Sequence, residues 1–284
     1  MPEALLAIKE QFESELASRI AALPDSRIKE AMGYSLLGGG KRIRPMLLFA
    51  ALDAYGVDMQ FGLSMACAIE MMHTYSLIHD DMPEMDNDEL RRGKPCNHIV
   101  FGSDIALLAG DALQTLAFES AASTSDAIKA GKLCLLLAKK AGAAGMAYGQ
   151  DLDLAGGADT SLDQLEAIEM YKTGCLFELP LCAAAILAGH DDDMDEWNAI
   201  GKAIGILFQI QDDLLEMTVS EEQMGKSLSD SKNEKATAIS LLGYEEGVRR
   251  VEAYFNEIET ILDRLSLDDK LLRSLIDSMK NRQN

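Results

Sequence analysis

The 284-residue sequence is poor in the residues that interrupt helices and build sheets. It has only 6 prolines, aromatic residues make up 6% of it, and 48% of its residues are hydrophobic. Alanine, leucine, methionine, glutamate and lysine occur throughout the chain, and these residues favour helix. No sustained alternation of apolar and polar residues indicates a sheet, and no internal repeat or linker divides the chain. The sequence therefore predicts one all-α domain, residues 1–284.

Positive charge is also scarce, because 26 lysines and arginines face 47 aspartates and glutamates and give a net charge of −21. Such a chain repels the phosphates of nucleic acid, so a nucleic-acid partner is excluded. An acidic protein that binds a small anion must gather its few cations locally. The positions of the lysines and arginines are therefore informative.

The five cysteines form no CxxC pair and their number is odd, which predicts reduced thiols in the cytoplasm and no structural zinc. The first 22 residues carry acids throughout, unlike a signal peptide. No apolar run approaches the roughly 20 residues that cross a bilayer. We expect a soluble cytoplasmic protein without a membrane span.

Carboxylates cluster where a long apolar segment ends, in the sequence from His73 to Pro95. On a helix of 3.6 residues per turn, His73 and Asp80 lie on one face, two turns apart. Pro83 disrupts the helix and should let Asp86 fold back beside Asp80. A charged helix end without function is the alternative, since an Asp-Asp pair alone is common.

A second acidic cluster lies inside an apolar helical segment, where Asp212, Asp213 and Glu216 occur within five residues. Asp212 and Glu216 share a face, and Gln209 precedes them by one turn. Uncompensated carboxylates in apolar surroundings cost several kcal/mol unless a positive partner meets them. A metal ion satisfies that requirement.

The cations stand at helix ends and in loops. Lys41 and Arg44 follow a glycine run and precede a helix start, where both can reach one phosphate group; an exposed basic turn is the alternative. Lys172 either extends its amine to solvent or pairs with an anion. Oxygen ligands without a Cys or His cage favour Mg²⁺, which often completes its shell with substrate phosphates. The pattern predicts a metal–diphosphate clamp above an apolar pocket.

These motifs together resemble the all-trans polyprenyl (isoprenyl) diphosphate synthases, closest to the bacterial farnesyl diphosphate synthases. The resemblance covers about residues 30 to 280 and implies the all-α isoprenoid synthase fold, a bundle of about ten or more helices around a central apolar pocket. Its motifs, in the family's order, are Gly-Gly-Gly-Lys41-Arg-Ile-Arg44-Pro, Asp80-Asp81-Met-Pro-Glu-Met-Asp86 with Arg91-Arg92-Gly, Tyr-Lys172-Thr173-Gly, and Phe-Gln209-Ile-Gln-Asp212-Asp213-Leu-Leu-Glu216 with Gly-Lys226.

The resemblance also implies a role for each matched residue. Three Mg²⁺ ions would be held by Asp80, Asp86 and Asp212, with Asp81, Asp213 and Glu216 behind them or joining them. Isopentenyl diphosphate would be held by Lys41, Arg44, His73 and Arg92. The allylic diphosphate would be held by Arg91, Lys172, Thr173, Gln209, Lys226 and Lys235, and among these Lys172, Thr173 and Gln209 would also stabilise the carbocation. Glu216 departs from the family's usual aspartate, but it keeps the charge, so we expect activity to survive.

The implied reaction condenses isopentenyl diphosphate with dimethylallyl or geranyl diphosphate through an allylic carbocation. Tyr75 and Ser76, about one turn before Asp80, are the expected floor of the pocket and favour farnesyl diphosphate as product. Tyr75 as an ordinary core aromatic is the alternative, and geranyl or geranylgeranyl diphosphate are alternative products. The family usually forms homodimers, for which the apolar segment 102–120 could supply an interface.

Three other functions compete with this hypothesis. A class I terpene cyclase shares the acidic clusters but does not need the residues expected to hold isopentenyl diphosphate. A non-catalytic helical partner subunit would be expected to have lost carboxylates or lysines, and none is missing. An acidic helical scaffold explains the composition but not the ordered cations.

Overall fold

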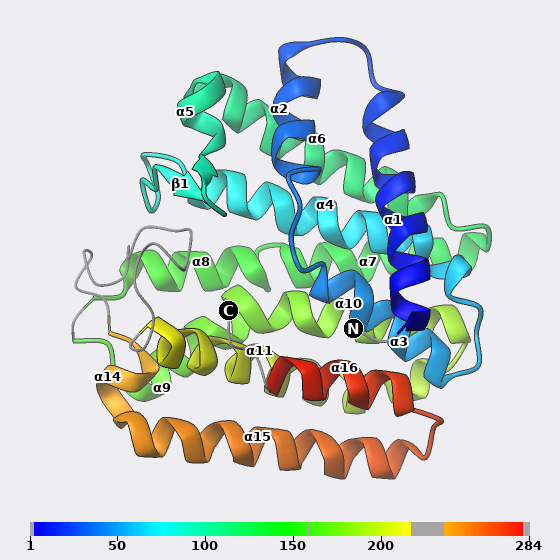
Figure 1. The fold of residues 1–284 in the computed structure, drawn as a ribbon, viewed down its shortest axis with the longest axis vertical. Coiled ribbons are helices and arrows are strands. Elements are labelled where there is room, and N and C mark those ends of the chain that lie inside the picture. The colour runs from blue at the N-terminus through cyan, green and yellow to red at the C-terminus, as the bar shows by residue number, and fades with distance from the viewer. Residues whose placement is uncertain (1–2, 158, 217–235, 281–284) are drawn as a thin grey trace.

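A computed structural model describes residues 3–157, 159–216 and 236–280. Lys226 and Lys235 lie outside the described residues, as does the side chain of Glu216. The predicted all-α architecture is confirmed (Figure 1). The α-helices are α1 (Glu3–Ala21), α2 (Arg27–Leu36), α3 (Ile43–Ala54), α4 (Leu63–Asp80), α5 (Asn97–Phe101), α6 (Ser103–Ala122), α7 (Ala127–Ala141), α8 (Met146–Ala155), α9 (Leu162–Ile168), α10 (Cys175–Ala188), α11 (Met194–Glu216), α14 (Ala238–Leu242), α15 (Tyr244–Leu265) and α16 (Lys270–Lys280). The shorter elements are η1 (Met59–Gly62), the π-helix η2 (Glu169–Gly174), η3 (Asp191–Asp193), and the strands β1 (Leu90–Arg91) and β2 (Lys94–Pro95).

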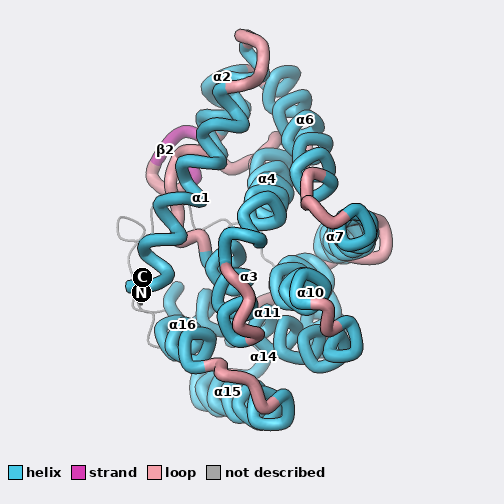
Figure 2. Tube along the Cα trace, turned by 90° about the vertical axis from the view of Figure 1, so that its right-hand side faces the viewer, coloured by secondary structure: helices cyan, strands magenta, loops and turns pink. Residues whose placement is uncertain are grey.

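The helices pack around a buried group formed by α3, α4, α10 and α11. Helix α4 lies along α6, and α10 packs against both α3 and α11. Helix α15 covers the outer side of α11 along the lower edge of Figure 1, and Figure 2 shows the same layering from the side. One continuous hydrophobic core extends from α1 to α16 and fixes the ends of α4 and α11 relative to each other.

Local sequence explains where several of these helices begin. Ser26 caps α2 by accepting a hydrogen bond from the Lys29 N–H at 3.1 Å. Ser161 and Gln164 form a capping box at the start of α9, since each side chain satisfies the other's backbone N–H. Such caps satisfy the donors that a helix start otherwise leaves unpaired.

The expectation that no apolar helical run approaches the length of a membrane span was wrong. Leu162–Ala188 is one continuous helical run, because η2 joins α9 to α10 without a break, and it is long and apolar enough to cross a bilayer. Most of its apolar window is buried inside the fold, however, and α10 is buried along nearly its whole length. This run is therefore a core helix, as the apolar segment 177–188 predicts.

A small hairpin corrects the expectation that the chain contains no sheet. Strands β1 and β2 pair antiparallel, with Arg91 opposite Lys94. Two residues per strand are too few for alternation to be seen in the sequence. Arg92 (φ 55°) and Gly93 (φ 73°) both adopt left-handed backbone conformations in the connecting turn, as a tight two-residue hairpin requires. The hairpin directs the adjacent side chains of Arg91 and Arg92 toward different binding partners.

Close contact between α11 and η2 depends on two facing glycines. A Cβ added to Gly205 would lie 2.5 Å from the Cα of Gly174, so the two backbones would have to move apart to accommodate it. We expect Gly205→Ala to lower the free energy of unfolding by about 1–3 kcal/mol, because overpacking forces the backbones apart. In a chain of this size each kcal/mol lowers Tm by about 2–4 °C.

Gly131→Ala is the matched control for this prediction. Gly131 also lies inside a helix, α7, but a Cβ there meets nothing within 4 Å. Alanine is the better helix former by roughly 0.5–1 kcal/mol, so this variant should melt at or above the wild-type temperature. Equal Tm values for the two variants in a thermal melt would contradict the assigned close contact.

Candidate active site

The first carboxylate cluster lies where α4 ends. Asp80 is the last residue of the helix, and Pro83 follows in the loop. The chain then turns back, so that the Asp86 N–H donates to the Asp80 carbonyl at 2.9 Å. Asp86 therefore returns beside Asp80, as the position of the proline predicts.

Charge inside this cluster is balanced by a lysine from another helix. Burial raises the pKa of the Asp80 carboxyl to about 6; Lys172 opposes that shift, and Asp86 adds to it. Burial would lower the pKa of Lys172, but Asp80, Asp153 and Asp86 outweigh it, so that the pKa is raised. The Lys172 amine also contacts the Asp153 carboxylate of α8 at 2.7 Å. Lys172 thus faces the metal-ligand candidates of α4.

Lys172 and Thr173 occupy the π-helix η2, which the sequence did not predict. Gly149 of α8 packs directly on the backbone at Lys172, and a Cβ there would overlap it. A π-turn inserts one extra residue into a helix and is frequent at functional sites. The widened turn, with close neighbours on both sides, fixes where the Lys172 side chain leaves the helix.

The second carboxylate cluster lies at the end of α11. Gln209 and Asp212 are half-buried and one turn apart. Burial lowers the pKa of the Arg44 guanidinium, and the charge of Asp212 is among those that oppose this shift. Asp213 is buried and accepts a hydrogen bond from the Ala238 N–H at 2.7 Å, which ties α11 to the start of α14. Asp212 remains the metal-ligand candidate of this pair.

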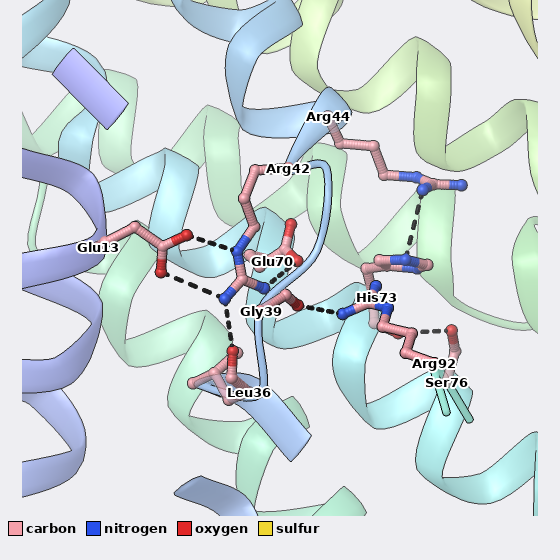
Figure 3. A network of polar contacts seen from close by, with 9 residues as sticks. All are labelled: Glu13, Leu36, Gly39, Arg42, Arg44, Glu70, His73, Ser76 and Arg92. Carbon is pink, nitrogen blue, oxygen red and sulfur yellow. Dashed lines mark hydrogen bonds and ion pairs between the residues drawn. The ribbon is translucent and has the colours of Figure 1, made fainter. Parts of the chain in front are cut away.

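Three of the residues expected to hold isopentenyl diphosphate meet beside α4 (Figure 3). Arg44 Nη1 lies 3.4 Å from His73 Nε2, and the Arg44 guanidinium covers the Phe177 ring at 4.4 Å. Burial, with Arg92 adding to it, lowers the pKa of Arg44 to about 10 against the opposing charges of Glu70 and Asp212. Arg92 donates to the Gly39 carbonyl in the turn that carries exposed Lys41. Cations from α3 and the hairpin are therefore gathered around a histidine of α4.

The other hairpin arginine is held differently. Arg91 forms an ion pair with buried Asp81 and a second one with Asp88 Oδ2 at 3.4 Å. Burial opposes the charge on Arg91, but Asp81 and then Asp88 outweigh it and raise its pKa. Asp81 thus lies behind Asp80 and fixes Arg91 at the rim of the cluster.

The residues expected at the pocket floor lie on α4 before Asp80. Tyr75 is 9% exposed, and its ring stands edge-on to His79 at 5.5 Å. Burial raises the pKa of its hydroxyl, and the side chain of Gln114 in α6 opposes that shift. Ser76 Oγ donates to the His73 carbonyl of its own helix at 2.9 Å. Tyr75 therefore fills the space between α4 and α6, whereas Ser76 is turned along its own helix.

Among the described residues, no three His, Cys, Asp or Glu side chains come together as a complete metal cage. The candidate ligands are Asp80 and Asp86, joined by a backbone hydrogen bond where α4 ends, and Asp212 near the end of α11. Hard oxygen ligands in this arrangement suit Mg²⁺, which takes few carboxylates and keeps positions for phosphate oxygens. The donor set fits a metal that is held jointly with a phosphorylated ligand.

Sequence reasoning missed two buried residues next to this site, Arg42 and Glu70, whose side chains form an ion pair at 2.6 Å. The available signal was Glu70 itself, a single carboxylate inside the apolar segment 65–72. The sequence offers no comparable signal for Arg42, because it lies between Lys41 and Arg44 and looks like one more residue of the same basic segment.

Comparisons with known proteins bear on the family and the fold of this chain. A family model described as "Polyprenyl synthetase" matches residues 25–276. The farnesyl diphosphate synthase of Bacillus subtilis (strain 168) is 43% identical over 95% of this chain and 94% of its own, and the geranylgeranyl diphosphate synthase of Cyanophora paradoxa is 41% identical over 97% and 94%. A solved geranyltransferase from Helicobacter pylori, complexed with magnesium and isoprenyl diphosphate, superimposes with a TM-score of 0.85 at 32% identity over 98% of this chain and 95% of that one.

The position of His73 generates a pH prediction. Burial, followed by the charges of Arg44 and Arg92, lowers its pKa well below the usual value. Below about pH 6.5 the unfolded chain therefore binds a proton that the folded protein rejects, and stability falls as the pH falls. This single group contributes a slope of up to about 1.4 kcal/mol per pH unit.

We expect His73→Gln to lose less stability than wild type between pH 7.5 and 5, as measured by thermal melts. His190→Gln removes an exposed histidine outside the site and serves as the control, with a curve parallel to wild type. If the stability of His73→Gln falls with pH in parallel with that of wild type, then protonation of His73 does not destabilise the folded protein.

Proposed function

The chain belongs to the polyprenyl synthetase family, and on that premise we propose that it is a magnesium-dependent trans-prenyltransferase that makes farnesyl diphosphate from isopentenyl diphosphate and dimethylallyl or geranyl diphosphate. The observation that carries this proposal is the meeting of opposite charges from distant elements. The Lys172 amine contacts Asp153 at 2.7 Å, and the charges of Asp80 and Asp86 help to raise its pKa against burial. Arg44 lies 3.4 Å from His73, and the charges of Glu70 and Asp212 favour its charged form. Such a site suits two diphosphates and the cations that accompany them.

The residues that would hold Mg²⁺ are Asp80 and Asp86 on one side and Asp212 on the other, with three ions as the proposed number. The solved geranyltransferase with bound magnesium and isoprenyl diphosphate supports this choice of metal. When bound, Mg²⁺ supplies positive charge that neutralises the departing diphosphate. Glu216, one turn after Asp212, is proposed to assist there.

The chain's own cations position the two substrates. Lys172 and Arg91 would bind the allylic diphosphate, together with Thr173, Gln209, Lys226 and Lys235. Arg44, His73 and Arg92 would bind isopentenyl diphosphate, together with Lys41. His73 has a strongly lowered pKa, so it is neutral and serves as a hydrogen-bonding group. Fixed cations around both diphosphates stabilise charge that develops as the allylic C–O bond breaks.

The apolar walls govern the rest of the reaction. Core residues of α4, α6 and α10 exclude water from the carbocation, which would otherwise be hydrolysed. The double bond of isopentenyl diphosphate attacks the cation, and loss of a proton to the released diphosphate gives a product five carbons longer. The backbone carbonyls of Lys172 and Thr173 in the π-helix, and the Gln209 amide, would stabilise the cation by their dipoles.

Tyr75 supports the proposed fifteen-carbon product. It is buried between α4 and α6, five residues before Asp80, where the tail of a growing chain would arrive. The relatives include both farnesyl and geranylgeranyl diphosphate synthases, so geranylgeranyl diphosphate is the second candidate product.

We further propose a cytoplasmic homodimer. Leu107 and Leu108 of α6 are each 46% exposed, and Ile99 and Val100 of α5, a helix that packs against α6, are exposed as well. Exposed apolar side chains of this kind favour contact with a second copy. A terpene cyclase is disfavoured, because it has no use for Arg44, His73 and Arg92 gathered around a second diphosphate site.

The first test incubates purified protein with Mg²⁺, radiolabelled isopentenyl diphosphate and dimethylallyl diphosphate, followed by sizing of the products. We expect Asp80→Asn to lower kcat by about 10²-fold or more, because charge on the leaving group is no longer neutralised. Asp111→Asn, which removes an exposed carboxylate of α6, should retain wild-type turnover. Folded wild-type protein that incorporates no label with any allylic starter would refute the proposal.

The floor residue is tested separately. Tyr75→Ala should lengthen the main product by at least one five-carbon unit, because removing the ring extends the space between α4 and α6. Tyr244→Ala removes a tyrosine that is 53% exposed at the start of α15 and should not change the product. An unchanged product distribution in Tyr75→Ala would show that chain growth stops elsewhere.

A further inference from the structure

Arg42 is a buried hub beneath the basic turn that carries Lys41 and Arg44 (Figure 3). Its side chain is completely buried, and its guanidinium reaches three segments of the chain. Nε and Nη2 donate to the two carboxylate oxygens of Glu13 in α1, at 2.9 and 3.2 Å. Nη2 also donates to the Leu36 carbonyl at the end of α2 at 2.8 Å, and Nη1 donates to Glu70 of α4 at 2.6 Å.

The backbone at Arg42 is held in an unusual conformation by these contacts. Arg42 precedes α3 with φ 54° and ψ 35°, a left-handed conformation that is uncommon for a residue with a side chain. Such a conformation persists where the surroundings over-determine it. Two residues earlier, Gly40 has φ 138°, a backbone conformation that residues with a side chain rarely adopt. The directions in which Lys41 and Arg44 leave the turn thus depend on the anchoring of Arg42.

Glu70 links this anchor to the other cations of the site. It is 2% exposed and lies one turn before His73 on α4. Burial and neighbouring arginines disfavour the charged forms of Arg44 and Arg92 and lower their pKa values. The strongest charge that opposes this effect is, for both arginines, that of Glu70. One buried carboxylate therefore pairs with Arg42 and also attracts the two arginines that would contact substrate.

We propose that Glu70 and Arg42 are positioning residues for isopentenyl diphosphate, acting through the turn that carries Lys41 and Arg44, with Glu13 as the second partner of Arg42. This inference rests on the proposed function. It assigns roles to residues that touch neither substrate, and it makes α1 part of the support of the binding site.

Electrostatics alone predicts the opposite effect of removing Glu70. Loss of a negative charge close to a diphosphate site raises the local positive potential and should tighten anion binding. Loss of a buried anchor instead frees the turn, and a misplacement of about 1 Å can weaken productive binding by an order of magnitude or more. The sign of the change therefore separates positioning from simple charge balance.

The experiment compares Glu70→Gln, Glu13→Gln and Glu15→Gln with wild type. Glu15→Gln is the matched control, because Glu15 also forms an ion pair on α1, at 2.9 Å, but with Arg19 rather than Arg42. The measurements are the KM for each substrate at saturating concentration of the other, and direct binding of isopentenyl diphosphate by calorimetry. Thermal melts verify that each variant is folded.

We expect the KM and the dissociation constant for isopentenyl diphosphate to rise about tenfold in Glu70→Gln and less in Glu13→Gln. The KM for the allylic diphosphate should change less than about twofold, because Lys172 and Arg91 are anchored by other carboxylates. Glu15→Gln should match wild type in both. If Glu70→Gln does not fold, partly exposed Glu13→Gln decides the question by the same two measurements.

Tighter or unchanged binding of isopentenyl diphosphate in the folded variants would overturn the inference, as would equal weakening for both substrates. A failure of the proposed function looks different, because the wild-type protein itself would then neither bind isopentenyl diphosphate nor incorporate it. Calorimetry on the wild type distinguishes the two cases without depending on turnover.

Discussion

The structure depends on keeping opposite charges close together inside an apolar helix bundle. An acidic chain concentrates cations beside α4 and η2 and holds three of them with particular carboxylates. Lys172 is held by Asp153, Arg91 by Asp81 and Arg42 by Glu70. Each pairing removes conformational freedom from a long side chain before any ligand arrives, so the ligand does not have to supply that ordering itself.

Backbone packing determines where these charges meet. Glycines 149 and 205 allow α8 and α11 to approach the π-helix so closely that no side chain would fit between them. The side chains of Lys172 and Thr173 are consequently placed by rigid helices and not by a loop. A site built on such elements keeps its geometry better than one built on flexible segments.

Local sequence predicted the parts of the site that depend on neighbouring residues. Pro83 and the six-residue spacing predicted that Asp86 returns beside Asp80, which the backbone hydrogen bond between them confirms. The π-turn was not predictable, because nothing in the segment 169–174 distinguishes it from an ordinary helical turn. The role of Arg42 was equally hidden, since Glu13 and Glu70 are 29 and 28 residues away and meet it only through tertiary packing.

The π-helix also changes the angular position of the residues that follow it in the same helical run. One additional residue per turn shifts everything that follows by about 100° around the axis relative to an uninterrupted α-helix. Phe177, which supports Arg44, lies after that shift, whereas Leu165 and Ile168 lie before it. Deleting a single residue from 169–174 would restore ordinary helical phase and turn α9 and α10 relative to each other. The length of this segment is therefore constrained independently of its composition.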